Sequence, residues 1–123
     1  MLRILLVEDH ADTAEILARL LRRMGHDVVH SGTLAAALRD AEAAMSSEPF
    51  DLVISDLGLP DGSGLDLMRE LSTCYALQGI ALSGFGMDAD LEHSKSAGFS
   101  YHLVKPVDIE TLRAVIVELT GAR

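Results

Sequence analysis

The sequence predicts an α/β protein built on one parallel sheet, because strand-like and helix-like segments alternate five times along its 123 residues. The strongest strand-like segments are apolar at consecutive positions, as is typical of strands covered on both faces. Most segments between them carry apolar residues every three or four positions, which is typical of helices with one buried face. A chain of this length forms one compact domain, so we expect residues 1–123 to be a single unit.

The five segments predicted to be strands are rich in Leu, Ile and Val. In chain order they are Leu2–Val7, Asp27–His30, Leu52–Ser55, Gly79–Ser83 and Tyr101–Val104. Right-handed crossovers leave few topologies for such a chain, and the commonest is the doubly wound five-stranded order 2-1-3-4-5. In that order the first and third strands are neighbours, and functional sites of such sheets lie beyond the carboxyl ends of these two strands.

The segments predicted to be helices are bounded by capping residues or glycine. Asp12 and Glu15 form a capping pair at the start of the first helix, and Gly25 closes it. Thr33 caps the second helix, and Asp108 caps the last. The helical ranges are 12–24, 34–45, 64–72, 88–97 and the segment from 109 onward. The fourth range is mostly polar, so we expect it to be weakly anchored.

Composition excludes several classes of protein. The net charge of −9 argues against nucleic acid binding, which requires Lys and Arg to neutralise phosphates. No apolar run approaches the roughly 20 residues of a membrane span. The single cysteine, Cys74, fits a reducing cytoplasm. The five histidines lack the spacing of a zinc site, and the few aromatic residues offer little for a flavin to stack on. We therefore expect a cytoplasmic domain that binds neither nucleic acid nor membrane.

Polar residues stand at the carboxyl ends of four predicted strands. Glu8 and Asp9 follow the first strand, and Asp56 follows the third. Ser83 ends the fourth strand, and Lys105 follows the fifth. Because the carboxyl ends of parallel strands meet at one edge of the sheet, we expect three carboxylates, a hydroxyl and an ammonium to share one crevice.

This combination points to phosphoryl transfer. Three carboxylates packed together need a cation, and hard oxygen ligands favour Mg²⁺, with Mn²⁺ as the alternative. Lys105 offers a point charge to one phosphoryl oxygen, and Ser83 offers a hydrogen bond to another. A carboxylate such as Asp56 can itself accept the group as an aspartyl-phosphate.

The segments that carry these residues are LLVEDH, DLVISDLGLPDGSGLDLMREL, ALSG and YHLVKPVD. Together they resemble the receiver domain of two-component response regulators, a CheY-like family with a flavodoxin-like fold. The resemblance covers nearly the whole chain. It implies that Asp56 accepts a phosphoryl group from a phosphohistidine of a sensor histidine kinase or phosphotransfer protein. It also implies Mg²⁺ bound by Glu8, Asp9, Asp56 and the backbone carbonyl of Gly58.

The chain departs from the family three residues before Lys105, where receivers usually have Tyr or Phe as a switch residue. Here the position is His102, and Tyr101 precedes it. Neighbouring strand residues face opposite ways, so we do not expect Tyr101 to substitute. His102 is thus the candidate switch partner of Ser83, and the alternative is a strand-end histidine without a switching role. The resemblance further implies a cis peptide bond between Lys105 and Pro106.

A second departure lies two residues beyond the acceptor and two beyond the hydroxyl. Receivers often have polar side chains there, whereas this chain has Gly58 and Phe85. Neither side chain can orient an attacking water. We therefore expect the phosphoryl group to be lost by unassisted hydrolysis.

The sequence thus predicts a phosphorylation-activated signalling switch that turns over no external substrate. We expect its output from the face made by 88–97, 101–104 and the last helix, which would bind a downstream protein, an attached output or kinase domain, or a second copy as a homodimer. One alternative is a phosphorylation-independent assembly module. Another is a Mg²⁺-dependent phosphohydrolase, which usually has an acid where Gly58 stands. The segments GLPDGSGLDLM and HLVKPVD look most like receivers of hybrid sensor kinases.

Overall fold

The computed structural model describes residues 1–75, 77–84 and 95–121. Its main sheet has five parallel strands: β1 (Arg3–Val7), β2 (Asp27–Ser31), β3 (Leu52–Asp56), β6 (Gln78–Ser83) and β7 (Tyr101–Val104). Their order in the sheet is β2-β1-β3-β6-β7. Two short strands intervene in the numbering, so this is the predicted doubly wound order 2-1-3-4-5. The carboxyl ends of β1 and β3 are therefore adjacent.

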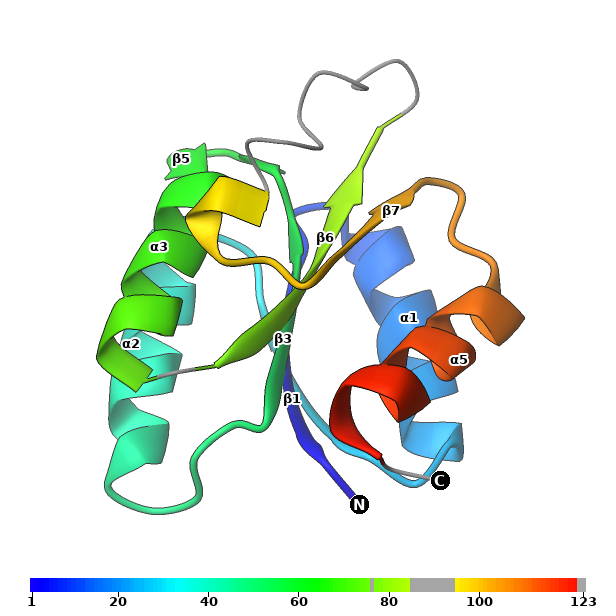
Figure 1. Cartoon of the computed structure of the whole chain (residues 1–123). Coiled ribbons are helices and arrows are strands. Elements are labelled where there is room, and N and C mark those ends of the chain that lie inside the picture. Colours follow the sequence, from blue (N-terminus) through cyan, green and yellow to red (C-terminus); the bar gives the residue numbers. More distant parts are fainter. Residues whose placement is uncertain (76, 85–94, 122–123) are drawn as a thin grey trace.

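Four long helices cover the two faces of the sheet: α1 (Ala11–Arg23), α2 (Leu34–Met45), α3 (Gly64–Tyr75) and α5 (Ile109–Thr120). The first and last lie on one face, and α2 and α3 lie on the other (Figure 1). Residues 95–97 are also helical and belong to the predicted helix 88–97, whose remaining residues lie outside the described part. None of the described helices has the length and apolar character needed to cross a membrane.

The start of α1 corrects the sequence prediction. Its N-cap is His10, which makes no side-chain capping hydrogen bond. Because the helix begins at Ala11, Asp12 lies inside its first turn and cannot act as the cap. Glu15 pairs instead with Arg19, whose Nη2 donates to Glu15 Oε1 at 2.8 Å. The predicted capping pair of Asp12 and Glu15 is therefore wrong.

The other predicted caps are present. Thr33 Oγ1 accepts a hydrogen bond from the backbone N–H of Ala36, and Asp108 Oδ2 accepts one from Thr111. Gly25 follows α1 with a φ of 95°, a left-handed conformation that favours glycine. The third helix runs to Tyr75 rather than to Ser72, since Tyr75 still packs against the core of that face.

The sheet separates two apolar layers. Side chains of β1, β3 and β6 alternate between them, so consecutive residues of one strand are buried on opposite faces. Leu5 and Val53 face α2 and α3, whereas Ile4 and Ile54 face α1 and α5. This two-sided burial explains the uninterrupted apolar runs in the sequence, and it holds the strand ends at the site in fixed positions.

A short antiparallel hairpin follows β3 where the sequence predicts only a loop. Its strands are β4 (Gly58–Leu59) and β5 (Gly62–Ser63). At its turn, the carboxylate of Asp61 accepts hydrogen bonds from the backbone N–H groups of Leu34 and Ala35, at 2.7 and 3.0 Å. These bonds hold the loop beyond Asp56 against the start of α2.

Candidate phosphoacceptor site

Asp56 is the last residue of the central strand β3, one residue beyond the predicted end of that strand. It pairs in register with Leu82 of β6 and is 8 % exposed. Its Oδ1 lies 3.4 Å from the backbone nitrogen of Gly58, which donates to it. Pairing with β6 holds the Asp56 backbone, so its carboxylate sits at the carboxyl-terminal end of the central strand.

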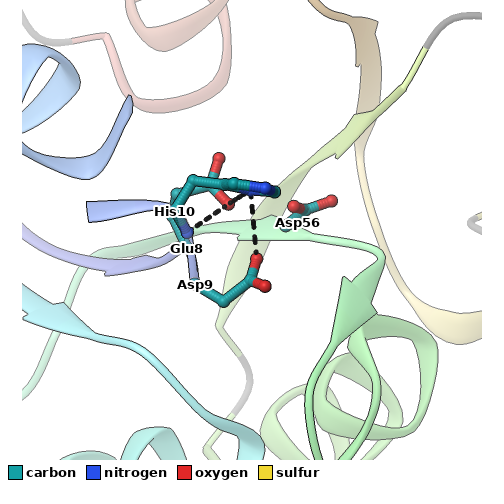
Figure 2. Close-up of side chains that lie close together, drawn as sticks. All are labelled: Glu8, Asp9, His10 and Asp56. Carbon is teal, nitrogen blue, oxygen red and sulfur yellow. Dashed lines mark hydrogen bonds and ion pairs between the residues drawn. The ribbon is translucent and has the colours of Figure 1, made fainter. Parts of the chain in front are cut away.

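Glu8 and Asp9 directly follow β1, the neighbour of β3. The Glu8 side chain is fully buried. Its backbone is held by β2, since its N–H donates to Ser31 O at 3.1 Å and its carbonyl lies 2.7 Å from His30 Nε2. Asp9 is exposed and reaches the same crevice from outside, as the chain turns into α1 (Figure 2).

Lys105 approaches these acids from the end of β7. Its ammonium forms an ion pair with Glu8 Oε1 and another, at 3.0 Å, with Asp56 Oδ2. Its backbone N–H donates to Ser83 O at 2.8 Å, which places the Lys105 side chain beyond the carboxyl ends of the strands. The peptide bond between Lys105 and Pro106 is cis, the isomer that the resemblance implies.

Burial and mutual charge set the ionisation of this cluster. Burial raises the pKa of Glu8, and its contact with Asp56 raises that pKa further, against the opposing effect of Lys105. Burial acts to lower the pKa of Lys105, but its hydrogen bonds to Glu8 and Asp56 outweigh burial and leave that pKa raised. The ammonium is therefore charged at neutral pH and incompletely balances the carboxylates.

The donor set fits a hard divalent cation. Glu8, Asp9, His10 and Asp56 each offer a ligand atom, and these atoms lie within 4.8 Å of one another (Figure 2). Three of the four donors are carboxylates, the ligands that Mg²⁺ and Mn²⁺ prefer. Within the described residues, the Lys105 ammonium pairs with two of these carboxylates, Glu8 and Asp56, so a bound cation would supply further positive charge.

His10 is the member of this cluster that sequence reasoning missed. Its Nδ1 lies 3.5 Å from Asp9 Oδ1 and 3.7 Å from Glu8 Oε2, while most of its ring is exposed. The sequence argues only against a zinc site, because the five histidines lack the spacing of one. The signal that could have singled out His10 is its position directly after the acidic pair.

Ser83 and His102 are brought together by the pairing of β6 with β7. The register places Ala81 opposite His102 and Ser83 opposite Val104, so the two polar side chains share one face. Ser83 is fully buried, and its Oγ lies 2.6 Å from His102 Nε2. This contact supports His102 as the candidate switch partner of Ser83, and whether it has a switching role stays a prediction.

Tyr101 lies on the opposite face of the sheet, as predicted. It packs against the layer under α1 and α5, and its hydroxyl donates to Glu118 Oε2 at 2.6 Å. Tyr101 therefore does not take the place of His102 beside Ser83. Phe85, the second departure noted in the sequence, lies outside the described residues.

Comparisons with known proteins agree with this geometry. The family model of the response regulator receiver domain matches residues 4–117. Over 114 residues the chain is 34% identical to the response regulator protein PilR of Pseudomonas aeruginosa, and over 112 residues it is 37% identical to the sensor protein TorS of Escherichia coli. These alignments cover 91% and 90% of this chain but only 24% and 12% of those two proteins.

Solved structures give the same result. A CheY-like receiver domain from Methylobacillus flagellatus superposes with a TM-score of 0.80 at 32% identity, covering 97% of this chain and 98% of that one. The signal receiver domain of a histidine kinase from Syntrophus aciditrophicus has a TM-score of 0.84 at 27% identity, covering 98% and 91%. The match of residues 4–117, together with this fold, shows that the chain belongs to the response regulator receiver domain family.

Proposed function

We propose that the chain is a signalling switch in which Asp56 accepts a phosphoryl group from a phosphohistidine of a sensor histidine kinase or phosphotransfer protein. The observation that carries this proposal is the position of the Asp56 carboxylate, at the end of the central strand and 3.0 Å from the Lys105 ammonium. The acidic pair Glu8 and Asp9 stands beside it. A carboxylate that served only solubility would not need to be buried and paired in this way.

In the transfer, one carboxylate oxygen of Asp56 forms a bond to phosphorus while the bond from phosphorus to the histidine nitrogen breaks. The electron pair of the broken bond stays on that nitrogen. Lys105 stabilises negative charge on the phosphoryl oxygens by its ammonium, and Ser83 can donate a hydrogen bond to one of them. Because no other group is consumed, the chain turns over no external substrate in this scheme.

The cation of this reaction would be held by Glu8, Asp9, Asp56 and the backbone carbonyl of Gly58. When bound, Mg²⁺ or Mn²⁺ supplies charge neutralisation to the phosphoryl oxygens. Gly58 carries no side chain that could position a water for hydrolysis. We therefore expect the phosphoryl group to leave slowly and without assistance.

The output of the switch would be a change in partner affinity at the face formed by the predicted helix 88–97, β7 and α5. Within this face Val104, the last residue of β7, is 48% exposed. Most of the predicted helix 88–97 lies outside the described residues. The partner would be a downstream protein, an attached output or kinase domain, or a second copy of the chain.

This domain would lie in the cytoplasm. It would be part of a larger signalling protein. Its segment of similarity to TorS is a small part of that sensor protein, and one solved neighbour is the receiver domain of a histidine kinase. Both similarities support the proposal that this receiver domain is part of a hybrid sensor kinase. That residues 1–123 form a single receiver domain remains a prediction.

The test is incubation with a small phosphodonor and Mg²⁺, read by intact mass. We expect one added phosphoryl group on the wild type and none on Asp56→Asn, while Asp66→Asn, an exposed acid of α3, is labelled like the wild type. Absence of labelling on the wild type would leave the assembly module as the better reading. Release of many phosphates per chain from excess donor would favour the phosphohydrolase.

A further inference from the structure

The contact between Ser83 and His102 joins the proposed phosphoacceptor site to the edge strand of the sheet. Ser83 lies one residue beyond Leu82, the register partner of Asp56, and β7 lies beside β6 (Figure 1). Within the described part of the chain, the hydrogen bond of the Ser83 hydroxyl goes to His102 Nε2 rather than to Asp56. The hydroxyl that could donate to a phosphoryl group from the end of β6 is therefore already engaged.

The burial of Ser83 indicates which atom donates. A buried hydroxyl proton needs an acceptor, because an unpaired buried donor is unfavourable. Ser83 is fully buried, and among the described residues its hydroxyl makes one side-chain hydrogen bond, the 2.6 Å contact between Ser83 Oγ and His102 Nε2. The geometry thus favours a Ser83 hydroxyl that donates its proton to an unprotonated Nε2, which in a neutral ring leaves the proton on Nδ1.

A phosphoryl group changes this arrangement, because its oxygens only accept hydrogen bonds. Ser83 has a single hydroxyl proton, so it cannot donate to the phosphoryl group and to His102 at once. The bond between the two side chains survives phosphorylation only if Nε2 carries a proton and donates to Ser83 Oγ.

We propose that His102 holds the hydroxyl proton of Ser83 while Asp56 is unmodified, and that phosphorylation reverses the hydrogen bond between them. The hydroxyl then rotates toward the phosphoryl group, and His102 donates from Nε2. The charge of the ring does not change in this exchange, since one proton leaves Nδ1 and another reaches Nε2. His102 is thus a positioning residue that acts through Ser83, and its tautomer reports the state of Asp56. The inference rests on the proposed function of Asp56.

An aromatic ring without nitrogen at this position could not make the exchange. In His102→Phe the Ser83 hydroxyl has no competing acceptor on the ring, so it is available to the incoming phosphoryl group from the outset. The energy of one hydrogen bond then corresponds to a labelling rate about two- to tenfold faster than that of the wild type. In a Ser83→Ala background the same substitution should have no effect on the rate, because the hydroxyl is gone.

The direct test is ¹⁵N nuclear magnetic resonance of the imidazole rings, with the His102 signal assigned by its loss in His102→Gln. Without ligand we expect Nε2 to resonate as a pyridine-type nitrogen. With Mg²⁺ and beryllofluoride, a mimic of the phosphoryl group, it should resonate as a pyrrole-type nitrogen. A pyrrole-type signal in the free protein, or a pyridine-type signal that persists with beryllofluoride bound, would overturn the proposal.

Labelling by a small phosphodonor, read by intact mass, separates this proposal from the function itself. No added mass on the wild type contradicts both. Normal labelling with an unchanged His102 signal contradicts the hydrogen-bond reversal alone. Equal effects of His102→Phe in the wild-type and Ser83→Ala backgrounds would show a merely structural role, and thermal unfolding of each variant confirms that it is folded.

Discussion

The side chain of Lys105 balances two carboxylates that the fold brings together, one of them fully buried. Glu8 has no exposed side-chain area, and its pKa is already raised in the presence of the ammonium. Burying these charged groups raises the free energy of the folded state alone, because the unfolded chain exposes each acid to water.

Replacing Lys105 by Met should lower the free energy of unfolding by about 1–3 kcal/mol at pH 7, since Glu8 and Asp56 lose their shared partner. The deficit should shrink at pH 5. A carboxyl group whose pKa is higher in the folded state than in the unfolded state gains stability as the pH falls toward the unfolded value. Urea unfolding at the two pH values measures this difference.

The matched control is Lys95→Met, which removes the other lysine of the chain at an exposed position. It should leave stability nearly unchanged at both pH values. An equal deficit for Lys105→Met at pH 7 and pH 5 would show that lost packing, rather than unbalanced charge, explains the effect.

At the scale of elements, the start of α3 packs directly against the end of β3. A Cβ atom on Gly64 would lie 2.2 Å from the carbonyl oxygen of Asp56 and 3.0 Å from the Cα atom of Leu57. The Gly64 N–H also donates to Leu57 O at 2.8 Å. The absence of a side chain is thus required by close approach, and it ties the helix to the backbone of the proposed acceptor.

Gly64→Ala should therefore reduce stability by about 1–3 kcal/mol, because the backbone of Asp56 must move to admit the methyl group. Labelling of Asp56 by a small phosphodonor should slow as well, since the carboxylate moves with its backbone. Thermal unfolding and intact mass measure the two effects. Gly32→Ala is the control, because the nearest heavy atom to its added Cβ is 4.0 Å away. Wild-type stability for Gly64→Ala would contradict the close packing described here.

At the scale of the whole molecule, the net charge of −9 and the acidic cluster predict that stability depends on divalent cations. Mg²⁺ at one hundred times its dissociation constant should raise the free energy of unfolding by about 2.7 kcal/mol, if it binds only the folded state. Asp9→Asn should lose most of this gain. Thermal unfolding with MgCl₂, compared with NaCl at equal ionic strength, measures it.

Glu70→Gln provides the control for this experiment, because it removes the same charge from an exposed position on α3. It should respond to Mg²⁺ as the wild type does. An identical response of Asp9→Asn and the wild type would mean that the gain comes from general screening of the negative charge rather than from the site.

Much of the fold and the site could be predicted because the informative residues stand at strand ends. The apolar runs indicate the parallel sheet, and the polar residues that follow them indicate the crevice. Three features could not be predicted. The start of α1 depends on where the chain leaves β1, the hairpin after Asp56 is held by α2, and the reach of His10 depends on how the chain turns beyond Asp9.

The hydrogen bond between His102 and Ser83 could be predicted only in part from the sequence. Strand periodicity correctly separates His102 from Tyr101, because neighbouring residues face opposite sides of the sheet. It does not give the register of β7 against β6, which decides that His102 meets Ser83 rather than another side chain. Register depends on packing across the sheet, and a single strand sequence does not contain that information.

The carboxylate of Asp61 joins two segments that are 27 residues apart, since it accepts from Leu34 while standing in the turn of the hairpin. It acts as a reversible crosslink between the two segments, formed by hydrogen bonds to a carboxylate rather than by a covalent bond. Hydrogen bonds from the backbone N–H groups of Ala35 and Leu34 lower the pKa of the Asp61 carboxyl. Their contribution to stability is therefore fully present above the pKa of this group in the unfolded chain, and it is lost as the pH falls through the lower pKa of the folded state. We expect acid to weaken this link between the hairpin and the start of α2.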